Sequence, residues 1–460
     1  MNEVVSTVRR RIGILRHLKH PAFRDFTMHE LRTRRDLPKQ LDALSAMHRA
    51  GHRYDFSDLS YAYFRRIFNS ARANSPFYRE RLSHLSRAPE FGSDLWRTIP
   101  ILDRRELQSQ GTRIQTLPPS LPIITSYFTG GTTGDPLQLS ALGGHDGDHQ
   151  EFLWRLHGYA DGDLIVAIDG TVVPDEKLNQ GIYWADKGLA DLPYGSMALS
   201  AHYLNSRTAV SYVNFLRESG AAFLRGYPSA IFELARHLET SGQRLQLKGV
   251  ELTSESHSHH QVRLIEQTIG PCFDQYGHVE AALFAYSAPG SNLLFCAPTY
   301  GLVEVIDESD QHVAVGETGE VVVTGFHNYS MPLIRYRTND RAVFSGRIDG
   351  ITRLESVEGR TQDIIYSADN TEYRLTALMI GRYYSGFSYI HQWQLVQQQL
   401  GEVEIRIVKK KGFSQQHEDD IRANFQKLAP GVTCSFAYPK ELERTKRGKT
   451  PLLIQRLESK

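Results

Sequence analysis

Short apolar runs alternate with amphipathic segments through the middle of the chain, and this alternation limits the fold more than any other feature. Residues 164–168 and 249–253 have the length and apolar character of buried strands. Residues 229–238 and 261–269 carry apolar side chains at helical spacing, which predicts helices. Strands that alternate with helices form sheets covered by helical layers, so the pattern predicts an α/β fold.

The segments on either side of this region extend the prediction. Before it, residues 37–85 have the periodicity of packing helices. Within it, residues 203–217 also predict a helix, and Ser229 is a candidate N-cap for the next one. After it, residues 302–306 and 320–324 predict an antiparallel hairpin.

The pattern of predicted elements changes again after this hairpin. Residues 403–408 predict a strand and residues 414–428 predict a helix, and the chain then ends in a strongly basic stretch. We therefore expect a large first domain over residues 1–358, with a helical and basic extension at 1–60, and a small domain over residues 359–460.

Composition restricts the class of protein. Apolar residues make up 40% of the 460-residue chain, charged residues make up 23%, and the formal net charge is +1. These values are ordinary for a globular protein and argue against a general polyanion binder, so we expect no nucleic-acid partner. The 3 cysteines are far apart, so neither a disulfide framework nor a thiolate zinc site is expected.

The sequence also bears on location. The first residues are basic but lack the apolar core of a signal peptide, and no run of about 18 apolar residues occurs. We therefore expect a cytoplasmic protein without an integral membrane segment. The basic start could contact an anionic membrane or an acidic partner, or it could be a solvated helix face.

Residues 129–136 form a glycine- and threonine-rich stretch that has the properties of an anion-binding loop. Glycines let backbone N–H groups converge on a phosphate, and threonine hydroxyls add further donors. A tight turn is the other interpretation of such a stretch. The candidate phosphate ligands are Thr129, Gly130, Gly131, Thr132, Thr133 and Gly134.

A second candidate phosphate ligand lies near the C-terminus, where Gly448, Lys449 and Thr450 have the ending of a Walker loop. The first glycine of that motif would fall at Glu443, and too few residues remain for the helix that should follow. A Walker loop is therefore excluded. Lys449 can still reach a phosphate as a point charge, or the segment is a frayed basic tail.

Tyr276, Gly277 and Glu280 follow a predicted strand over residues 271–276, at the end where α/β sheets bind ligands. The aromatic ring of Tyr276 could stack on a base, and the Glu280 carboxylate could bind Mg²⁺. A packed tyrosine and a surface glutamate are the alternatives.

Asp340 and Arg360 complete the candidate set. The Asp340 carboxylate could accept two ribose hydroxyls, and Arg360 supplies a cation soon after it. Surface loops are the alternative for both residues.

His257, His259 and His260 resemble a metal site at first sight. Histidines so close together at a helix start cannot all face one ion, and no cysteine or acidic residue is spaced to complete a tetrahedron. The sequence therefore does not favour a metal there.

Taken in order, these motifs resemble the adenylate-forming superfamily, and within it the phenylacetate-CoA ligase and capsule-biosynthesis branch. The resemblance covers about residues 60–455, and each motif is weak by itself, whereas their shared order is specific. The matching segments are the loop at 129–136, Tyr-Gly-x-x-Glu at 276–280, the hairpin at 316–324, Arg-Tyr-x-x-x-Asp within 331–340, the hinge at 359–363 and Arg-Thr-x-x-Gly-Lys at 444–449.

The resemblance implies a large N-terminal domain of layered sheets and helices and a small, mobile α+β lid. It implies ATP and Mg²⁺ as cofactors and a small carboxylic acid as substrate, with the acid converted to an acyl-adenylate. Lys449, Glu280 and Thr132 would be catalytic, with Glu280 on Mg²⁺ and residues 129–134 on the phosphates. Tyr276 and Gly277 would contact adenine, and Asp340 and Arg360 would contact the ribose.

The acyl acceptor is left open by the resemblance. CoA is the acceptor of most relatives, whereas an amide- or ester-forming ligase would use an amine or a hydroxyl. Residues 367–371 lack the glycine that CoA ligases usually have in the lid, which favours the second class. Val279 and Asn339 replace a usual threonine and glycine, and Gln362 departs from the usual hinge residue. A non-catalytic nucleotide- or partner-binding relative is the remaining class.

Overall fold

The structure is a computed structural model of the chain. It describes residues 20–119, 121, 123–129, 137–188, 193–205, 207–254, 257, 259–358, 364–374, 389–409, 411–440, 442–443 and 453–457.

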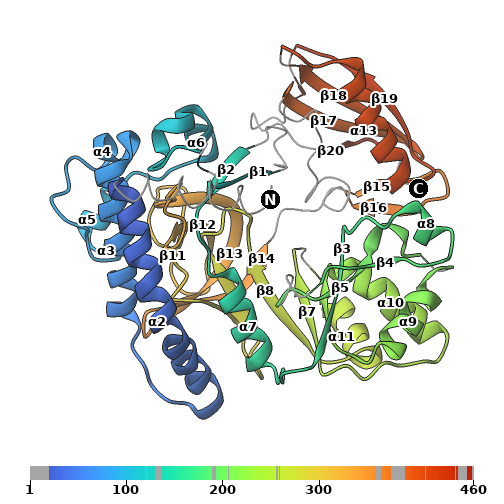
Figure 1. The fold of residues 1–460 in the computed structure, drawn as a ribbon, viewed down its shortest axis with the longest axis horizontal. Helices are drawn as coiled ribbons and strands as arrows, with labels where there is room; N and C mark the ends of the chain where they lie inside the picture. The colour runs from blue at the N-terminus through green and yellow to red at the C-terminus, as the bar shows by residue number, and fades with distance from the viewer. Residues whose placement is uncertain are drawn as a thin grey trace, which may run out of the picture.

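Helices surround the sheets on both sides (Figure 1). The described helices are α2 (Pro21–Ala50), α3 (Ser57–Asn74), α4 (Pro76–Arg81), α5 (Asp94–Arg97), α6 (Arg104–Gln110), η1 (Gly111–Ile114), α7 (Asp146–Leu156), α8 (Asp175–Leu178), η3 (Ala201–Tyr203), α9 (Ala209–Glu218), α10 (Pro228–Thr240), α11 (His259–Thr268) and α13 (Gln415–Leu428).

The strands form one large sheet and three small ones within the described residues. They are β1 (Thr125–Thr129), β2 (Leu137–Ala141), β3 (Leu164–Asp169), β4 (Trp184–Asp186), β5 (Met197–Ser200), β6 (Ala221–Gly226), β7 (Gly249–Thr253), β8 (Cys272–Gly277), β9 (Phe284–Ser287), β10 (Leu294–Cys296), β11 (Gly301–Ile306), β12 (Thr318–Gly325), β13 (Tyr336–Ile348), β14 (Ile351–Glu358), β15 (Ile364–Tyr366), β16 (Glu372–Arg374), β17 (Ile390–Gln399), β18 (Glu402–Lys409), β19 (Thr433–Ala437) and β20 (Leu453–Gln455).

The large sheet has 12 strands in the order β11-β12-β13-β14-β10-β9-β8-β7-β6-β3-β5-β4. Strands β8, β7, β6, β3 and β5 run parallel, whereas β9 to β14 pair antiparallel. The change occurs at β8, which is parallel to β7 and antiparallel to β9. The predicted α/β fold and the predicted hairpin of β11 and β12 are confirmed.

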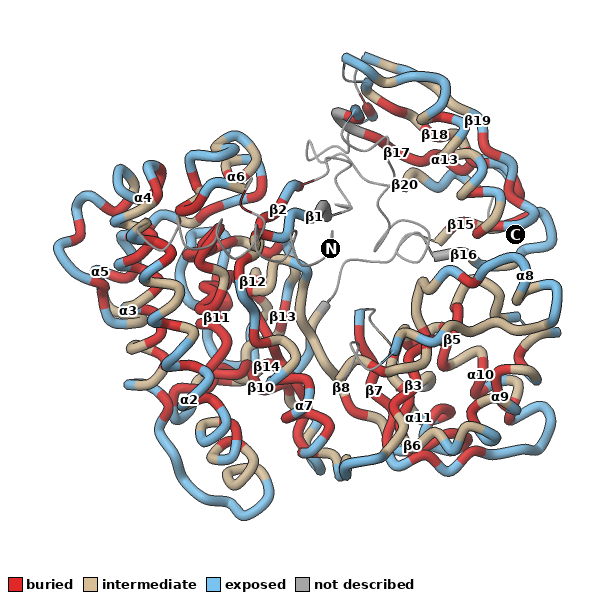
Figure 2. Tube along the Cα trace, in the orientation of Figure 1, coloured by how far each residue is buried: buried red, intermediate tan, exposed pale blue. Residues whose placement is uncertain are grey.

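Each half of the large sheet has its own helices and its own core (Figure 2). Helices α9, α10 and α11 pack on the parallel strands through aliphatic side chains such as Leu234 and Ile265. On the antiparallel half, α3 and α4 bury aromatic side chains such as Phe64 and Tyr78. The alternation of apolar strands with amphipathic helices thus produces two helix-covered layers.

Two local predictions in this region are wrong. The helix predicted at residues 203–217 begins at Ala209, because the Asn205 side chain accepts hydrogen bonds from the backbone of Arg207 and Thr208 and holds the chain in a turn. Ser229 is not an N-cap: Tyr227 occupies that position, and Pro228 is the first residue of α10.

The C-terminal residues form a separate sheet in the order β19-β18-β17-β20. Helix α13 packs on it, and Trp393, Ile405 and Phe425 belong to a core distinct from those of the large sheet. Lys427 of α13 lies 2.9 Å from Asp175 of α8, so the two parts touch at this point (Figure 1). The domain boundary after residue 358 stays a prediction, because residues 359–363 lie outside the described residues.

No helix among the described residues is both long and apolar enough to cross a membrane.

A buried ion pair connects the antiparallel strands. Arg335, which is 2% exposed, bonds both carboxylate oxygens of Glu304 at 3.0 and 2.9 Å and the backbone oxygen of Ile99 at 2.7 Å. Its backbone has φ 49°, a conformation that costs energy for a residue with a side chain. The two bonds to Glu304 hold the segment before β13 against β11, and the third holds it to the segment before α6.

Replacement of this arginine tests its contribution to the fold. We expect Arg335→Met to lower the free energy of unfolding by roughly 3–5 kcal/mol, because the substitution removes the guanidinium from the buried Glu304 carboxylate and leaves it with His312. Arg337→Met is the matched control, since Arg337 is partly exposed where it pairs with Glu320 and Asp310, and we expect it to cost less than about 1 kcal/mol. Urea unfolding followed by circular dichroism measures both; equal losses would contradict the interpretation.

Candidate functional site

Tyr276 lies near the end of β8 and Asp340 lies in β13, and their side chains meet. The Tyr276 hydroxyl donates to Asp340 Oδ2 at 2.9 Å. Burial, followed by the nearby Asp340 carboxylate, raises the pKa of Tyr276 well above its usual range, so the hydroxyl stays protonated and donates. The structure thus brings together two residues that the sequence motifs identified separately.

Asn339 explains how a departure from the family motif is tolerated. It has φ 64°, the left-handed conformation that a glycine adopts without strain. Asparagine is one of the few other residues that adopt it readily. The backbone that presents Asp340 therefore keeps the geometry that a glycine would allow.

Glu280 follows β8 and is nearly buried. Its carboxylate lies 3.4 Å from His278 Nδ1 and 3.4 Å from the Tyr336 hydroxyl. Burial by itself would raise the pKa of Glu280, but the His278 ring and then the Arg104 guanidinium lower it to about 2. Glu280 is therefore ionised at neutral pH, as a ligand for a hard cation must be.

A cavity of about 420 Å³ opens beside these residues. Val279, on its wall, is 48% exposed, and its neighbours His278 and Ala281 also face the space. The remaining lining residues are Thr125, Ala141, Gly143, Gly144, Asp146, Tyr300, His327 and Asn328. The wall thus combines small residues with polar side chains, and it lies next to Glu280 in the chain.

The glycine-rich loop connects two paired strands. β1 and β2 are antiparallel, and Thr129 is paired with Leu137, so the backbone of Thr129 is the last described position before the loop. Gly130, Gly131, Thr132, Thr133 and Gly134 lie outside the described residues. The same is true of Arg360, Gln362 and Lys449, and their roles remain predictions.

The histidine group at residues 257–260 has a simpler explanation than a metal. His257 Nε2 lies 2.7 Å from Asp274 Oδ1, and this carboxylate, working against burial, raises the pKa of His257. The side chains of His259 and His260 lie outside the described residues. Within the described part, His257 is therefore held by an acidic partner.

Sequence reasoning missed several residues around the site. Asp146, Tyr300, His327 and Asn328 line the cavity, and Tyr300 donates a hydrogen bond to Asp146. These residues come from a helix start, the turn before β11 and the segment after β12. No local motif links such distant segments, and only the folded chain brings them together.

Comparison with known proteins identifies the fold. No family model matches the chain. The chain is 20% identical to Protein CapK of Staphylococcus aureus over 329 residues, which is 68% of this chain and 70% of that protein.

Two crystal structures of 2-hydroxyisobutyryl-CoA ligase are similar over most of their length. The complex with 2-HIB-AMP and CoA in the thioesterification state has a TM-score of 0.54 and 18% identity, and the match covers 87% of this chain and 90% of that one. The complex with R3-HIB-AMP in the postadenylation state has a TM-score of 0.52 and 16% identity, with 87% and 89% covered.

The chain therefore has the fold of adenylate-forming, AMP-producing ligases, as its ordered motifs predicted. The large mixed sheet and the separate C-terminal sheet are the described parts of that fold.

The contact between Tyr276 and Asp340 can be tested by a double-mutant cycle. Tyr276→Phe removes only the hydroxyl, and we expect it to lower the free energy of unfolding by about 1–2 kcal/mol, the cost of a buried hydrogen bond to a charged group. When it is combined with Asp340→Ala, the two losses should not add, because both remove the same bond. Asp310→Ala, which removes a partner of Arg337, is the control, and its loss of unfolding free energy should add to that of Tyr276→Phe. If the losses of Tyr276→Phe and Asp340→Ala also add, the contact is refuted.

Proposed function

We propose that the protein activates a carboxylic acid with ATP and transfers the resulting acyl group to CoA. The observation that carries the proposal is the cluster at the end of β8, where Tyr276, Asp340 and the ionised Glu280 lie beside a cavity, in a chain with the adenylate-forming fold. In open α/β sheets, ligands bind outside the carboxyl ends of the strands, where this cluster lies.

The first step joins the acid to AMP. A carboxylate oxygen of the substrate attacks the α-phosphorus of ATP, the bond to the bridging oxygen breaks, and pyrophosphate leaves with that oxygen. Two anions meet in this step, so positive charge must lie between them. Lys449 and residues 129–134 supply the cation and the N–H groups in this proposal.

The magnesium site of the proposal is Glu280. A buried carboxylate whose pKa is lowered to about 2 is ionised, and it matches the preference of Mg²⁺ for oxygen ligands. The ion would neutralise charge on the phosphate oxygens. Asp340 would accept the ribose hydroxyls, and the Tyr276 hydroxyl holds this carboxylate in position.

The cavity is the proposed acid-binding pocket. Its residues His278, Val279 and Ala281 flank Glu280 in the chain, so an acid bound there would have its carboxylate close to the phosphates. The polar groups of Asp146, His327 and Asn328 favour an acid that carries hydroxyl or amide groups of its own.

In the second step, the acceptor attacks the acyl carbonyl carbon and AMP leaves. With CoA the thiolate sulfur forms a thioester, and the thiol proton passes to solvent. An amine or a hydroxyl acceptor is the second candidate, and the segment before β16 favours it. There Ser367 is buried and its backbone N–H bonds Thr371 O at 3.0 Å, forming a closed turn without glycine.

The catalytic lysine can be tested against a neighbour in the same tail. We expect Lys449→Ala to slow acyl-adenylate formation by about 100-fold or more, because it removes the charge that stabilises the transition state. Lys446→Ala is the matched control, since position 446 is a variable position of the motif, and its rate should stay within about threefold. Isotope exchange between pyrophosphate and ATP measures both variants; equal effects would contradict the assignment.

The acceptor is tested by pyrophosphate release from ATP and Mg²⁺ with a panel of hydroxy, aryl, fatty and sugar-derived acids. Each acid is assayed without acceptor, with CoA and with a mixture of amines. We expect one acid whose turnover rises at least about tenfold with CoA, since the acceptor releases the bound adenylate. A rise with amines alone would assign the protein to the amide-forming class. No release with any acid, together with no ATP binding by calorimetry, would overturn the enzymatic proposal.

A further inference from the structure

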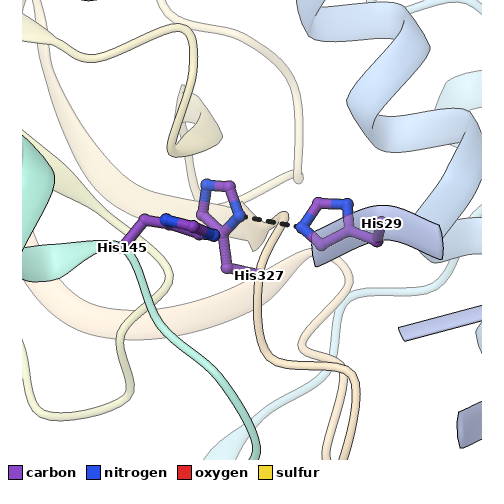
Figure 3. A group of neighbouring side chains, drawn as sticks. All are labelled: His29, His145 and His327. Atoms are coloured by element: carbon purple, nitrogen blue, oxygen red, sulfur yellow. Dashed lines mark hydrogen bonds between the residues drawn. The ribbon is translucent and has the colours of Figure 1, made fainter. Parts of the chain in front are cut away.

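A group of buried histidines lies behind the cavity and belongs to none of the motifs described above. His29 comes from α2, His145 directly precedes α7, and His327 follows β12. Their side chains are 1%, 4% and 3% exposed. One nitrogen from each ring lies within 4.8 Å of the others, and the His327 ring lies between the rings of His145 and His29 (Figure 3).

Two of the distances between facing atoms match those around a tetrahedral ion. His29 Nε2 lies 3.0 Å from His327 Nδ1, and His145 Nε2 lies 3.3 Å from the Glu30 carboxylate. Ligand atoms about 2.1 Å from a tetrahedral Zn²⁺ are about 3.4 Å apart, close to both distances. His145 Nε2 is buried and makes no hydrogen bond, although the Glu30 carboxylate lies near it.

Acceptors hold the outward nitrogens of His145 and His327, whereas His29 Nδ1 is buried without a hydrogen bond. His145 Nδ1 lies 2.6 Å from Asp148 Oδ2, and His327 Nε2 donates to the backbone oxygen of Thr299 at 2.9 Å. An acceptor on one ring nitrogen places the proton there and leaves a lone pair on the other. Ligand histidines in metalloproteins have the same support, often from a carboxylate.

We propose that His29, His145 and His327 bind a divalent transition metal such as Zn²⁺, with Glu30 as the fourth ligand. Three imidazoles and one carboxylate suit zinc, cobalt or copper, whereas Mg²⁺ prefers oxygen ligands. Arg34 Nε donates to Glu30 Oε1 at 2.7 Å and leaves Oε2 facing His145.

The site ties the N-terminal helix to the cavity wall. Helix α2 approaches the segment before α7 so closely that a Cβ on Gly143, which has φ 76°, would lie 2.6 Å from the Phe26 ring. Gly143 and His327 both line the cavity. A metal on His327 thus fixes one wall of the cavity to α2, and the resulting role is structural.

The competing interpretation is a metal-free cluster. His29 Nε2–H can donate to His327 Nδ1, and His29 Nδ1 then stays without a hydrogen bond. In such a cluster His145 Nε2 has only the Glu30 carboxylate at 3.3 Å, in a geometry that makes no hydrogen bond. An ion in the centre provides a partner for all three rings.

The direct test uses the full-length wild-type protein. It is purified without a metal-affinity step, its metal content is measured by plasma mass spectrometry, and it is then stripped by a chelator and titrated with Co²⁺. We expect about one zinc per chain as purified and the visible d–d absorption of tetrahedral Co²⁺ on titration. If the purified protein contains no zinc and shows no d–d absorption with excess Co²⁺, the proposal is overturned.

Variants locate the ion. His29→Gln and His145→Gln should each weaken Co²⁺ binding by at least about tenfold, because each removes a ligand. If either histidine variant fails to fold, Glu30→Gln replaces it as the test, because Glu30 is less buried. We expect this variant to shift the cobalt spectrum. His48→Gln is the matched control: His48 also lies on α2 and bonds the Tyr286 hydroxyl at 2.9 Å.

Other results of these measurements would contradict the proposed metal site. The site is refuted if His29→Gln and His145→Gln fold and bind cobalt with unchanged affinity. If those variants do not fold, an unchanged cobalt spectrum in Glu30→Gln refutes it. Hydrogen exchange gives an independent measurement, since removal of the metal should increase exchange in α2 (Pro21–Ala50). None of these readouts depends on ligase activity.

Discussion

The pairing of β8 is the constraint on which the rest of the structure depends. This strand is parallel to β7 and antiparallel to β9, so it joins the two halves of the large sheet. A chain leaving a parallel strand at its carboxyl end must turn at the sheet edge before it returns as an antiparallel neighbour. That turn carries His278, Val279 and Glu280, and it therefore forms both a wall of the cavity and the anionic site beside it.

Burial of charge shapes the antiparallel half. Arg335 and Glu304 are both nearly inaccessible, and each is tolerated because the other is present. Glu280 is a different case, because its carboxylate lies 3.4 Å from the His278 ring, and this ring is the first cause that lowers its pKa. The first arrangement holds strands together, whereas the second leaves a carboxylate with capacity to bind a cation. The same strand region thus contains one charge used for the fold and one suited to chemistry.

The extension formed by α2 contributes to the site as well as to the core. Its aliphatic residues Leu37 and Leu44 pack with α7 and the sheet, while His29 and Glu30 face the segment next to the cavity. Helix α2 therefore contacts a segment that lines the cavity. Its proposed metal would add a bound ion to that contact.

The sequence alone determined the fold class, the strands at 249–253 and 302–306, and the order of the motifs, because apolar periodicity and glycine-rich loops are local properties. It could not reveal that Asn205 delays α9, that Arg335 pairs with Glu304, or that Tyr276 donates to Asp340. The histidines show the limit most clearly: the sequence drew attention to His257, His259 and His260, whereas His29, His145 and His327 are far apart in the chain and meet only in the folded protein. Spacing between nearby residues can be determined from the sequence. Contacts between distant segments depend on how the sheets and helices pack, so only the tertiary structure decided them.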